Sequence, residues 1–286
     1  MEYVILNNGV RMPILGYGVF QVTKDECKDC VANALKVGYR LIDTAQSYGN
    51  EEEVGEAIKE SGIAREDIFL TTKVWIDNYS YEGTKKSIYE SMRKLKTDYL
   101  DLVLLHQPFC DYHAAYKSLE DLYLEGKIKA IGISNFSSDR MVDLALDARI
   151  KPMINQIETN PLNQQVEEHK WMEKYNIQHE SWAPFGEGKS NMFQNETLNK
   201  IALKYNKSIA QVILKWQVQR GIVVIPKSLR VDRMKENLNI FDFNLSEEDM
   251  GEILKLDTKT SLFFSHSDPH MVEWFYDLIK ERKGKI

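Results

Sequence analysis

The sequence has few cysteines, no long apolar block and no excess of positive charge. Three cysteines in 286 residues are too few for a disulfide framework. No window approaches the roughly 20 apolar residues of a membrane-spanning helix, and the amino terminus lacks the basic start of a targeting segment. The formal net charge of −6 gives no general electrostatic footprint for nucleic acid or an anionic membrane. We therefore expect a soluble cytoplasmic protein with neither of these partners.

Two common site motifs are also incomplete. Cys27 and Cys30 form a C-x-x-C, but no second pair completes a zinc site and helical apolar spacing continues through them, so we expect no metal. The stretch GYGVFQ, which begins at Gly16, is only a near miss to the dinucleotide motif G-x-G-x-x-G, and no helical pattern follows it at once. The sequence therefore argues against a Rossmann fold.

Short apolar runs that alternate with helical patterns organise the chain. Eight runs bounded by polar turns are typical of buried strands: ILGYGVF, YRLIDTA, IFLTTKVW, YLDLVLLHQP, IKAIGISNF, PMINQIETN, IQHESWAPF and IVVIPKS. Helical patterns occupy Lys24–Val37, Glu51–Glu60, Tyr81–Leu95, Ala114–Leu124, Asp139–Ala148, Val166–Tyr175, Leu198–Gln219 and Val231–Leu238. Eight strands, each followed by a helix, predict an α/β fold, a (β/α)8 TIM barrel of ~250 residues.

The remaining segments fit around such a barrel. The hairpin pattern YVILNNGVRM, with its Asn-Gly turn, precedes the first barrel strand, and we expect it to cap the barrel bottom. The tail segment LFFSHSDPHMVEWF is too aromatic for a disordered end, and we expect it to fold back near the active-site face. No linker or low-complexity tract interrupts the chain, so residues 1–286 are predicted to form a single domain.

Polar side chains stand where the predicted strands end. Asp43 ends the second strand with Tyr48 just beyond it, Lys73 ends the third strand, and His106 ends the fourth. A TIM barrel assembles its active site at the carboxyl ends of its strands, so these side chains would share one rim. Each alone has a structural explanation, as a capping aspartate, a loop aromatic, a surface lysine or a core histidine. Their coincidence on one rim predicts an active site.

The chain resembles the aldo-keto reductases from its hairpin to its tail. The resemblance is carried by LIDTAQSYGNEEEVG, TTKVW, LLHQP, IGISNF, NQIETNP and IPKS, in the order and spacing of that family. It is strongest to the bacterial 2,5-diketogluconate and methylglyoxal reductase-like branch. The resemblance implies a monomeric enzyme that reduces aldehydes and ketones with NADPH, small dicarbonyls or keto-sugars among them. It places the catalytic tetrad of the family on Asp43, Tyr48, Lys73 and His106.

Carbonyl chemistry gives each member of this tetrad a role. Reduction leaves negative charge on the carbonyl oxygen and needs a proton donor, a role that fits Tyr48. The ammonium of Lys73 would lower the pKa of this phenol, and Asp43 would hold the ammonium in place and offset its burial. A neutral His106 would donate a hydrogen bond to the carbonyl oxygen and fix the face that meets the hydride.

The stretch IPKSLRVDRMKEN predicts a second site. It puts Lys227 and Ser228 at a strand end and Arg230 and Arg233 at the beginning of a helix. Cations and free backbone amides there make an anion site, although a solvated charged helix would give the same pattern. By resemblance, the adenosine 2′-phosphate of NADPH would bind Lys227, Ser228 and Arg233, with Glu236 and Asn237 nearer the adenine.

The resemblance also assigns the nicotinamide and substrate contacts. It gives the carboxamide to Ser134, Asn135 and Gln156, and it puts Trp182 under the nicotinamide, where many relatives have tyrosine. Gln107 stands after the catalytic histidine, where many relatives have tryptophan, so the polarity of the pocket differs. The aromatic residues expected to form a wall for the substrate, beside His106, are Phe20, Trp75 and Phe109.

Two other functions remain open at this stage. Lys73 could form a Schiff base in a barrel lyase, although no other residue favours that chemistry. The chain could also be a non-catalytic relative that binds NADPH as a sensor or a partner subunit. Complete retention of the tetrad argues against such a role.

Overall fold

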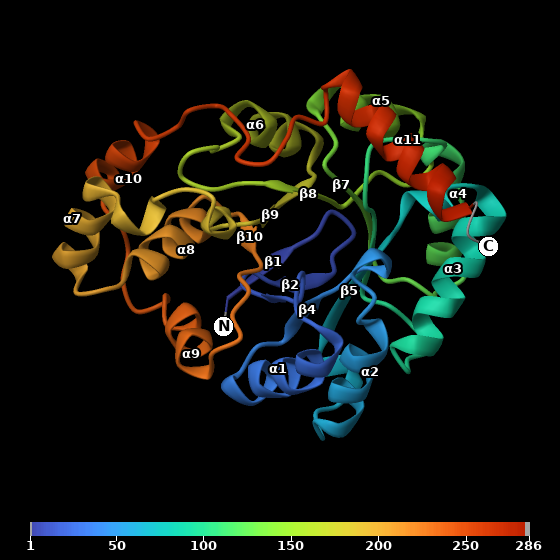
Figure 1. The fold of residues 1–286 in the computed structure, drawn as a ribbon, viewed down its shortest axis with the longest axis horizontal. Helices are drawn as coiled ribbons and strands as arrows, with labels where there is room; N and C mark the ends of the chain where they lie inside the picture. Colours follow the sequence, from blue (N-terminus) through green and yellow to red (C-terminus); the bar gives the residue numbers. More distant parts are fainter. Residues whose placement is uncertain (1, 284–286) are drawn as a thin grey trace.

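Eight parallel strands form the centre of the protein (Figure 1), whose computed structural model describes residues 2–283. The strands are β3 (Tyr17–Gly18), β4 (Leu41–Asp43), β5 (Phe69–Val74), β6 (Leu102–Leu105), β7 (Ile131–Ser134), β8 (Ile154–Glu158), β9 (Gln178–Trp182) and β10 (Val223–Val224). They pair in sequence order from β3 to β10. The sheet also closes on itself, because the Gly16 amide donates to the Val224 carbonyl (2.8 Å) and the Val224 amide to the Ile14 carbonyl (2.9 Å). The predicted (β/α)8 barrel is confirmed.

Helices surround this barrel (Figure 1). They are α1 (Lys24–Val37), α2 (Glu51–Glu60), α3 (Tyr81–Lys94), α4 (Tyr112–Leu124), α5 (Ser138–Asp147), α6 (Val166–Tyr175), α7 (Glu196–Tyr205), α8 (Ile209–Gln219), α9 (Val231–Leu238), α10 (Glu247–Leu254) and α11 (Pro269–Lys283). Short 3-10 turns lie at η1 (Gln46–Tyr48), η2 (Arg65–Asp67), η3 (Ile76–Asn78), η4 (Gly186–Gly188) and η5 (Met192–Gln194). Among residues 2–283, no helix is both long and apolar enough to cross a bilayer.

The prediction of one helix over 198–219 is wrong, because the chain forms α7 and α8 there. Asn206 ends α7 in the left-handed conformation (φ 53°), which asparagine tolerates better than most residues. Ser208 then begins α8 with a capping box, in which its hydroxyl accepts from the Gln211 amide and the Gln211 side chain accepts from the Ser208 amide. The two caps divide what the apolar spacing alone presents as one helix.

The glycines of the near-miss motif GYGVFQ serve the closure of the barrel. A Cβ atom at Gly16 would lie 2.4 Å from Cγ of Leu41, and one at Gly18 would lie 2.9 Å from the carbonyl oxygen of Ile225. Glycine therefore allows β3 to pack against its neighbours β4 and β10. This packing explains why the two positions are glycine.

The amino-terminal hairpin closes one end of the barrel, as predicted. Its strands β1 (Tyr3–Ile5) and β2 (Arg11–Pro13) are antiparallel, and Gly9 takes a positive φ of 86° in the turn. The side-chain amide of Asn7 donates to the carbonyl of Pro152, just before β8, and that of Asn8 donates to the carbonyl of Lys129, just before β7. The hairpin is thus fixed to the loops that lead into the strands, which leaves the opposite end for the site.

The carboxyl-terminal tail covers the opposite end, also as predicted. Ser261 donates its hydroxyl to the carboxylate of Glu158, the last residue of β8, and the Leu262 amide donates to the same group. Farther along, Phe275 of α11 packs with its ring centre 6.1 Å from that of Trp75 and 5.0 Å from that of Phe109. The tail therefore contacts the carboxyl ends of several strands.

Candidate active site

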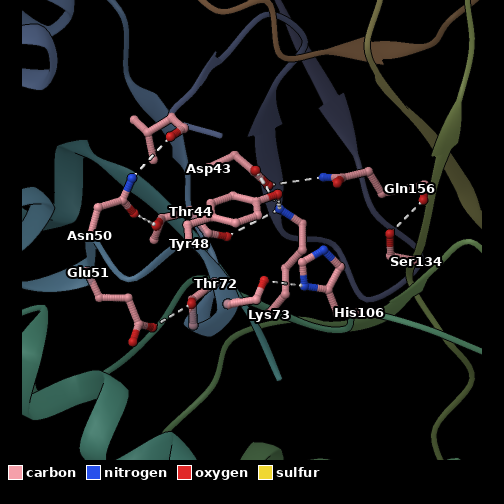
Figure 2. A network of polar contacts seen from close by, with 12 residues as sticks. Asp43, Thr44, Tyr48, Asn50, Glu51, Thr72, Lys73, His106, Ser134 and Gln156 are labelled. Atoms are coloured by element: carbon pink, nitrogen blue, oxygen red, sulfur yellow. Dashed lines mark hydrogen bonds and ion pairs between the residues drawn. The ribbon is translucent and has the colours of Figure 1, made fainter. Parts of the chain in front are cut away.

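A buried ion pair lies where β4 and β5 end (Figure 2). Nζ of Lys73 donates to Oδ1 of Asp43 at 2.5 Å and to the carbonyl of Thr44 at 3.2 Å. The other carboxylate oxygen of Asp43 accepts from the side-chain amide of Gln156 on β8 at 3.0 Å. Burial opposes the charged form of Lys73, but Asp43 and Tyr48 outweigh it and raise the pKa of the lysine. Lys73 is therefore an ammonium held in one place.

Tyr48 reaches this ion pair from a short loop that is itself fixed. The hydroxyl of Thr44 donates to the side-chain oxygen of Asn50 (2.8 Å), whose amide donates to the Val19 carbonyl (3.0 Å). Between these anchors, η1 carries Tyr48, and Gly49 reverses the chain with a φ of 71°. The phenol oxygen of Tyr48 then lies 3.4 Å from Nζ of Lys73 (Figure 2).

The pKa of Tyr48 departs from the sequence-based expectation. Burial raises it to about 12, Lys73 acts in the opposite direction, and Asp43 adds to the rise. The ammonium thus has the expected effect, but desolvation of the phenolate outweighs it. Tyr48 is consequently a protonated phenol at neutral pH, which is the form that a proton donor requires.

His106 is a neutral imidazole beside the same phenol. Burial lowers its pKa well below the usual value, and the charge of Lys73 and the nearby His266 act in the same direction. Nδ1 of His106 lies 3.3 Å from the hydroxyl of Ser47. If Ser47 donates to Nδ1, the proton of the neutral ring is on Nε2, where it can serve as a hydrogen-bond donor.

A cavity of about 480 Å³ opens above these groups. Of the residues predicted for the site, it is lined by Phe20, Asp43, Tyr48, His106, Ser134, Asn135, Gln156, Trp182 and Lys227. Lys73 lies beneath Tyr48, fully buried and outside the lining. The cavity has the size of a small-molecule or cofactor site.

Polar and aromatic groups from β7, β8 and β9 form one wall of the cavity. The Asn135 side chain donates to the His106 carbonyl (3.0 Å) and accepts from the indole nitrogen of Trp182 (2.9 Å). The hydroxyl of Ser134 donates to the Gln156 backbone carbonyl at 2.8 Å. These bonds hold the Trp182 ring in a fixed orientation at the cavity edge, as stacking on a flat ligand would require.

The predicted phosphate-binding residues lie at the start of α9. Lys227 lines the cavity, Ser228 is buried, and Arg233 is exposed in the first turn of the helix. Arg230 instead pairs with Asp232 (2.5 Å). Positive side chains near a helix amino terminus oppose the helix dipole, and a bound anion would relieve this repulsion. Of the two residues predicted nearer the adenine, Glu236 is half-buried and Asn237 is buried.

The predicted aromatic wall is only partly at the cavity. Phe20 lines it and packs on Tyr48 with ring centres 4.9 Å apart. Trp75 stands behind His106 (5.1 Å), and Phe109 packs on His266 of the tail (6.0 Å). Neither Trp75 nor Phe109 is among the lining residues.

Several lining residues were missed from the sequence. The tail contributes Phe263, Phe264 and His266, and the loop around η4 contributes Glu187 and Lys189. Nε2 of His266 lies 2.9 Å from the side-chain oxygen of Gln107, which fixes the tail beside the residue that follows His106. The aromatic composition of the tail indicated its position. Nothing in the spacing of these residues assigns the individual contacts.

A closed barrel with a protonated phenol, a buried ammonium and a neutral imidazole at one cavity is typical of an enzyme that acts on a small molecule. Comparison with known proteins supplies the particular family. Residues 14–258 match the model of the Aldo/keto reductase family. The chain belongs to this family, and it is an oxidoreductase.

Three relatives are informative. The glyoxal reductase of Bacillus subtilis is 49% identical over 254 residues, which cover 88% of this chain and 91% of that protein. The methylglyoxal reductase of Escherichia coli K12 is 41% identical over 255 residues, 88% of this chain and 92% of that protein. The aldo-keto reductase of Bombyx mori, solved in complex with NADP, is 32% identical with a TM-score of 0.88, and the match covers 92% of this chain and 95% of that one.

Proposed function

We propose that this protein reduces small carbonyl compounds to alcohols with NADPH, and that α-oxo-aldehydes and keto-sugars are its substrate class. The observation that carries the proposal is Tyr48, which lines the cavity and whose hydroxyl lies 3.4 Å from the Lys73 ammonium. The relatives that act on glyoxal and methylglyoxal support the substrate class. From the resemblance to the aldo-keto reductases we further propose a cytoplasmic monomer that acts on small molecules, and the net charge of −6 gives no general attraction to nucleic acid or an anionic membrane.

The residues around the cavity fit a nicotinamide cofactor. Ser134, Asn135 and Gln156 offer polar groups for a carboxamide, and the fixed Trp182 ring offers a face for stacking. Lys227 and Arg233 offer positive charge for the 2′-phosphate, with Ser228, Glu236 and Asn237 beside them. When bound, NADPH supplies a hydride to the carbonyl carbon.

Tyr48 gives its proton to the carbonyl oxygen during this reduction. Lys73 stabilises the phenolate left behind, and Asp43 keeps the ammonium charged and in position. His106 donates a hydrogen bond from Nε2 to the same carbonyl oxygen and so orients the substrate. The same ion pair argues against Schiff-base chemistry, because a nucleophilic lysine must be neutral and Asp43 raises the pKa of Lys73.

Steady-state turnover tests the proposal. We expect the purified protein to oxidise NADPH in the presence of glyoxal, methylglyoxal or a keto-sugar, with one alcohol formed per NADPH consumed. NADPH absorbance and product chromatography give the two quantities. A protein that binds NADPH but turns over none of these compounds would be the non-catalytic relative instead.

Cofactor preference gives a second prediction for the same site. Arg233→Met should weaken NADPH binding by roughly 10- to 150-fold, because a charge-assisted hydrogen bond to phosphate contributes ~1.5–3 kcal/mol. NADH binding should hardly change, since NADH lacks the 2′-phosphate. The preference for NADPH should also shrink as salt rises, because Arg233 is exposed. Dissociation constants for both cofactors at two ionic strengths measure these effects.

Arg230→Met is the matched control, because the charge of Arg230 is already paired with Asp232. We expect it to weaken NADPH less than Arg233→Met does. An equal loss of affinity for NADPH and NADH in Arg233→Met would mean that Arg233 supports the fold, and the phosphate site would then lie elsewhere.

A further inference from the structure

Glu180 is a buried acid that the proposed mechanism leaves unused. It lies in the middle of β9, pairs in register with Gln156 of β8 and Val223 of β10, and has no exposed surface. Its neighbour in sequence, His179, contacts His169 of the surrounding helix α6. Because side chains alternate along a strand, Glu180 faces the barrel interior, toward the side that holds Gln156, Asp43 and Lys73.

The carboxyl group of Glu180 lacks the partners that a buried charge needs. Within residues 2–283, neither of its oxygens makes a hydrogen bond of regular geometry. The adjacent Gln156 donates to Asp43 at 3.0 Å, and its side chain favours the charged form of Glu180 less than burial and Asp43 oppose it. Lys73, whose ammonium donates to Asp43 at 2.5 Å, also lowers the pKa of Glu180, but by less than burial and Asp43 raise it. An ionised Glu180 would therefore be a second negative charge beside one ammonium, whereas a protonated Glu180 adds no charge.

The charged groups that face Glu180 also favour its protonated form. They are Asp43 from β4 and Lys73 from β5, while the flanking strands β8 and β10 contribute the uncharged Gln156 and Val223. Burial raises the pKa of Glu180 to about 8, and Asp43 acts in the same direction, against smaller effects of Gln156 and Lys73. Glu180 is consequently protonated at neutral pH.

We propose that Glu180 is a positioning residue that must remain protonated. With Glu180 protonated, Asp43 is the single carboxylate beside Lys73, and the charge of the ammonium can stabilise negative charge on Tyr48. This inference rests on the proposed role of Tyr48 as proton donor. When Glu180 ionises, the added negative charge disfavours the phenolate that Tyr48 becomes as it gives up its proton. Carbonyl reduction should therefore slow as pH rises through the titration of Glu180.

The pH profile of Glu180→Gln tests this inference, since glutamine has the same shape and no titration. For the wild-type protein, we expect kcat/KM for methylglyoxal at saturating NADPH to fall about tenfold between pH 7 and pH 9. In Glu180→Gln, this alkaline fall should move to higher pH, so the ratio of variant to wild-type kcat/KM should rise with pH. If hydride transfer is the pH-dependent step, single-turnover oxidation of NADPH should show the same shift.

Glu51→Gln is the matched control. Glu51 is also buried and its pKa is also raised by burial, but it lies on α2, where it accepts a hydrogen bond from Thr72 at 2.7 Å. The alkaline limb of the Glu51→Gln pH profile should coincide with that of the wild-type protein. If the pH profiles of Glu180→Gln and wild type also coincide while both proteins reduce methylglyoxal, the inference is overturned. Absence of reduction by the wild-type protein would instead overturn the proposed function.

Protein stability provides a readout that needs no turnover. A carboxyl with a higher pKa in the folded than in the unfolded state keeps its proton on folding, so stability falls as pH rises from the unfolded value to about 8. Denaturant unfolding should show this fall in wild type and a smaller one in Glu180→Gln. Glu180→Leu, of similar size, should behave in the same way if the glutamine variant does not fold. Equal slopes in all variants would mean that Glu180 is ionised and would overturn the inference.

Discussion

Tyr48→Phe should lower kcat/KM for carbonyl reduction by about 10²- to 10⁴-fold, which is the usual contribution of a general acid. The phenylalanine keeps the ring that packs between Phe20 and His106, but it removes the hydroxyl beside Lys73. NADPH binding should change little, because the role proposed for the hydroxyl is contact with the substrate carbonyl and not with the cofactor phosphates. Turnover and the NADPH dissociation constant are the two measurements.

Tyr39→Phe is the control for loss of a buried phenol hydroxyl. Tyr39 is fully buried and donates to the Met234 carbonyl at 3.0 Å, away from the cavity lining. It should cost about 1 kcal/mol of stability and leave turnover nearly unchanged. If Tyr48→Phe retains more than a few per cent of wild-type turnover, Tyr48 is not the proton donor.

Lys73→Met should remove carbonyl reduction and also destabilise the fold. Methionine replaces the four-carbon stem of lysine with a chain of the same number of atoms, but it leaves the Asp43 carboxylate buried without its cation. Breaking a buried ion pair by removing one partner costs about 3–5 kcal/mol. Denaturant unfolding measures the loss of stability, and single-turnover NADPH oxidation measures the loss of reduction.

The double variant Lys73→Met with Asp43→Asn separates the two losses. Asparagine removes the unpaired charge, so the double variant should regain part of the stability that Lys73→Met loses. Reduction should stay lost, because no ammonium remains to stabilise the Tyr48 phenolate. Recovery of turnover together with stability would show that Lys73 is needed only for folding.

The barrel could be predicted from the sequence because its strands are buried on both faces. Such strands appear as nearly continuous apolar runs, and the helices between them keep an amphipathic spacing. The division of residues 198–219 into α7 and α8 could not be predicted in the same way. The break at Asn206 contains neither glycine nor proline, and the helical apolar spacing continues on both sides of it.

The part of the candidate site that lies at the carboxyl ends of the strands could be predicted from the sequence. Asp43 ends β4, Lys73 is the next-to-last residue of β5 and His106 directly follows β6, so the barrel geometry alone brings them together. Glu180 was missed because its contacts come from other strands of the barrel. The sequence did contain a signal for its orientation. Side chains alternate along a strand, so Glu180 must face the barrel interior if His179 and Ser181 face outward.

The pKa of Tyr48 shows what residue identity alone does not provide. A lysine near a tyrosine predicts a lower pKa, but the size of the opposing burial effect depends on how completely loops and tail surround the phenol. That enclosure comes from residues distant in the sequence, such as Phe20 and His106. The direction of each contribution was predictable, and their balance was not.

The hydrogen bonds between the first and last barrel strands limit when the barrel can close during synthesis. The hydrogen bonds that close the barrel join Gly16 to Val224, so they cannot form on the ribosome until nearly all of the chain has emerged. The tail that holds His266 against Gln107 is synthesised later still. During synthesis, Asp43, Tyr48, Lys73 and His106 are therefore made before the tail residues that cover the cavity, and the cavity is finished last.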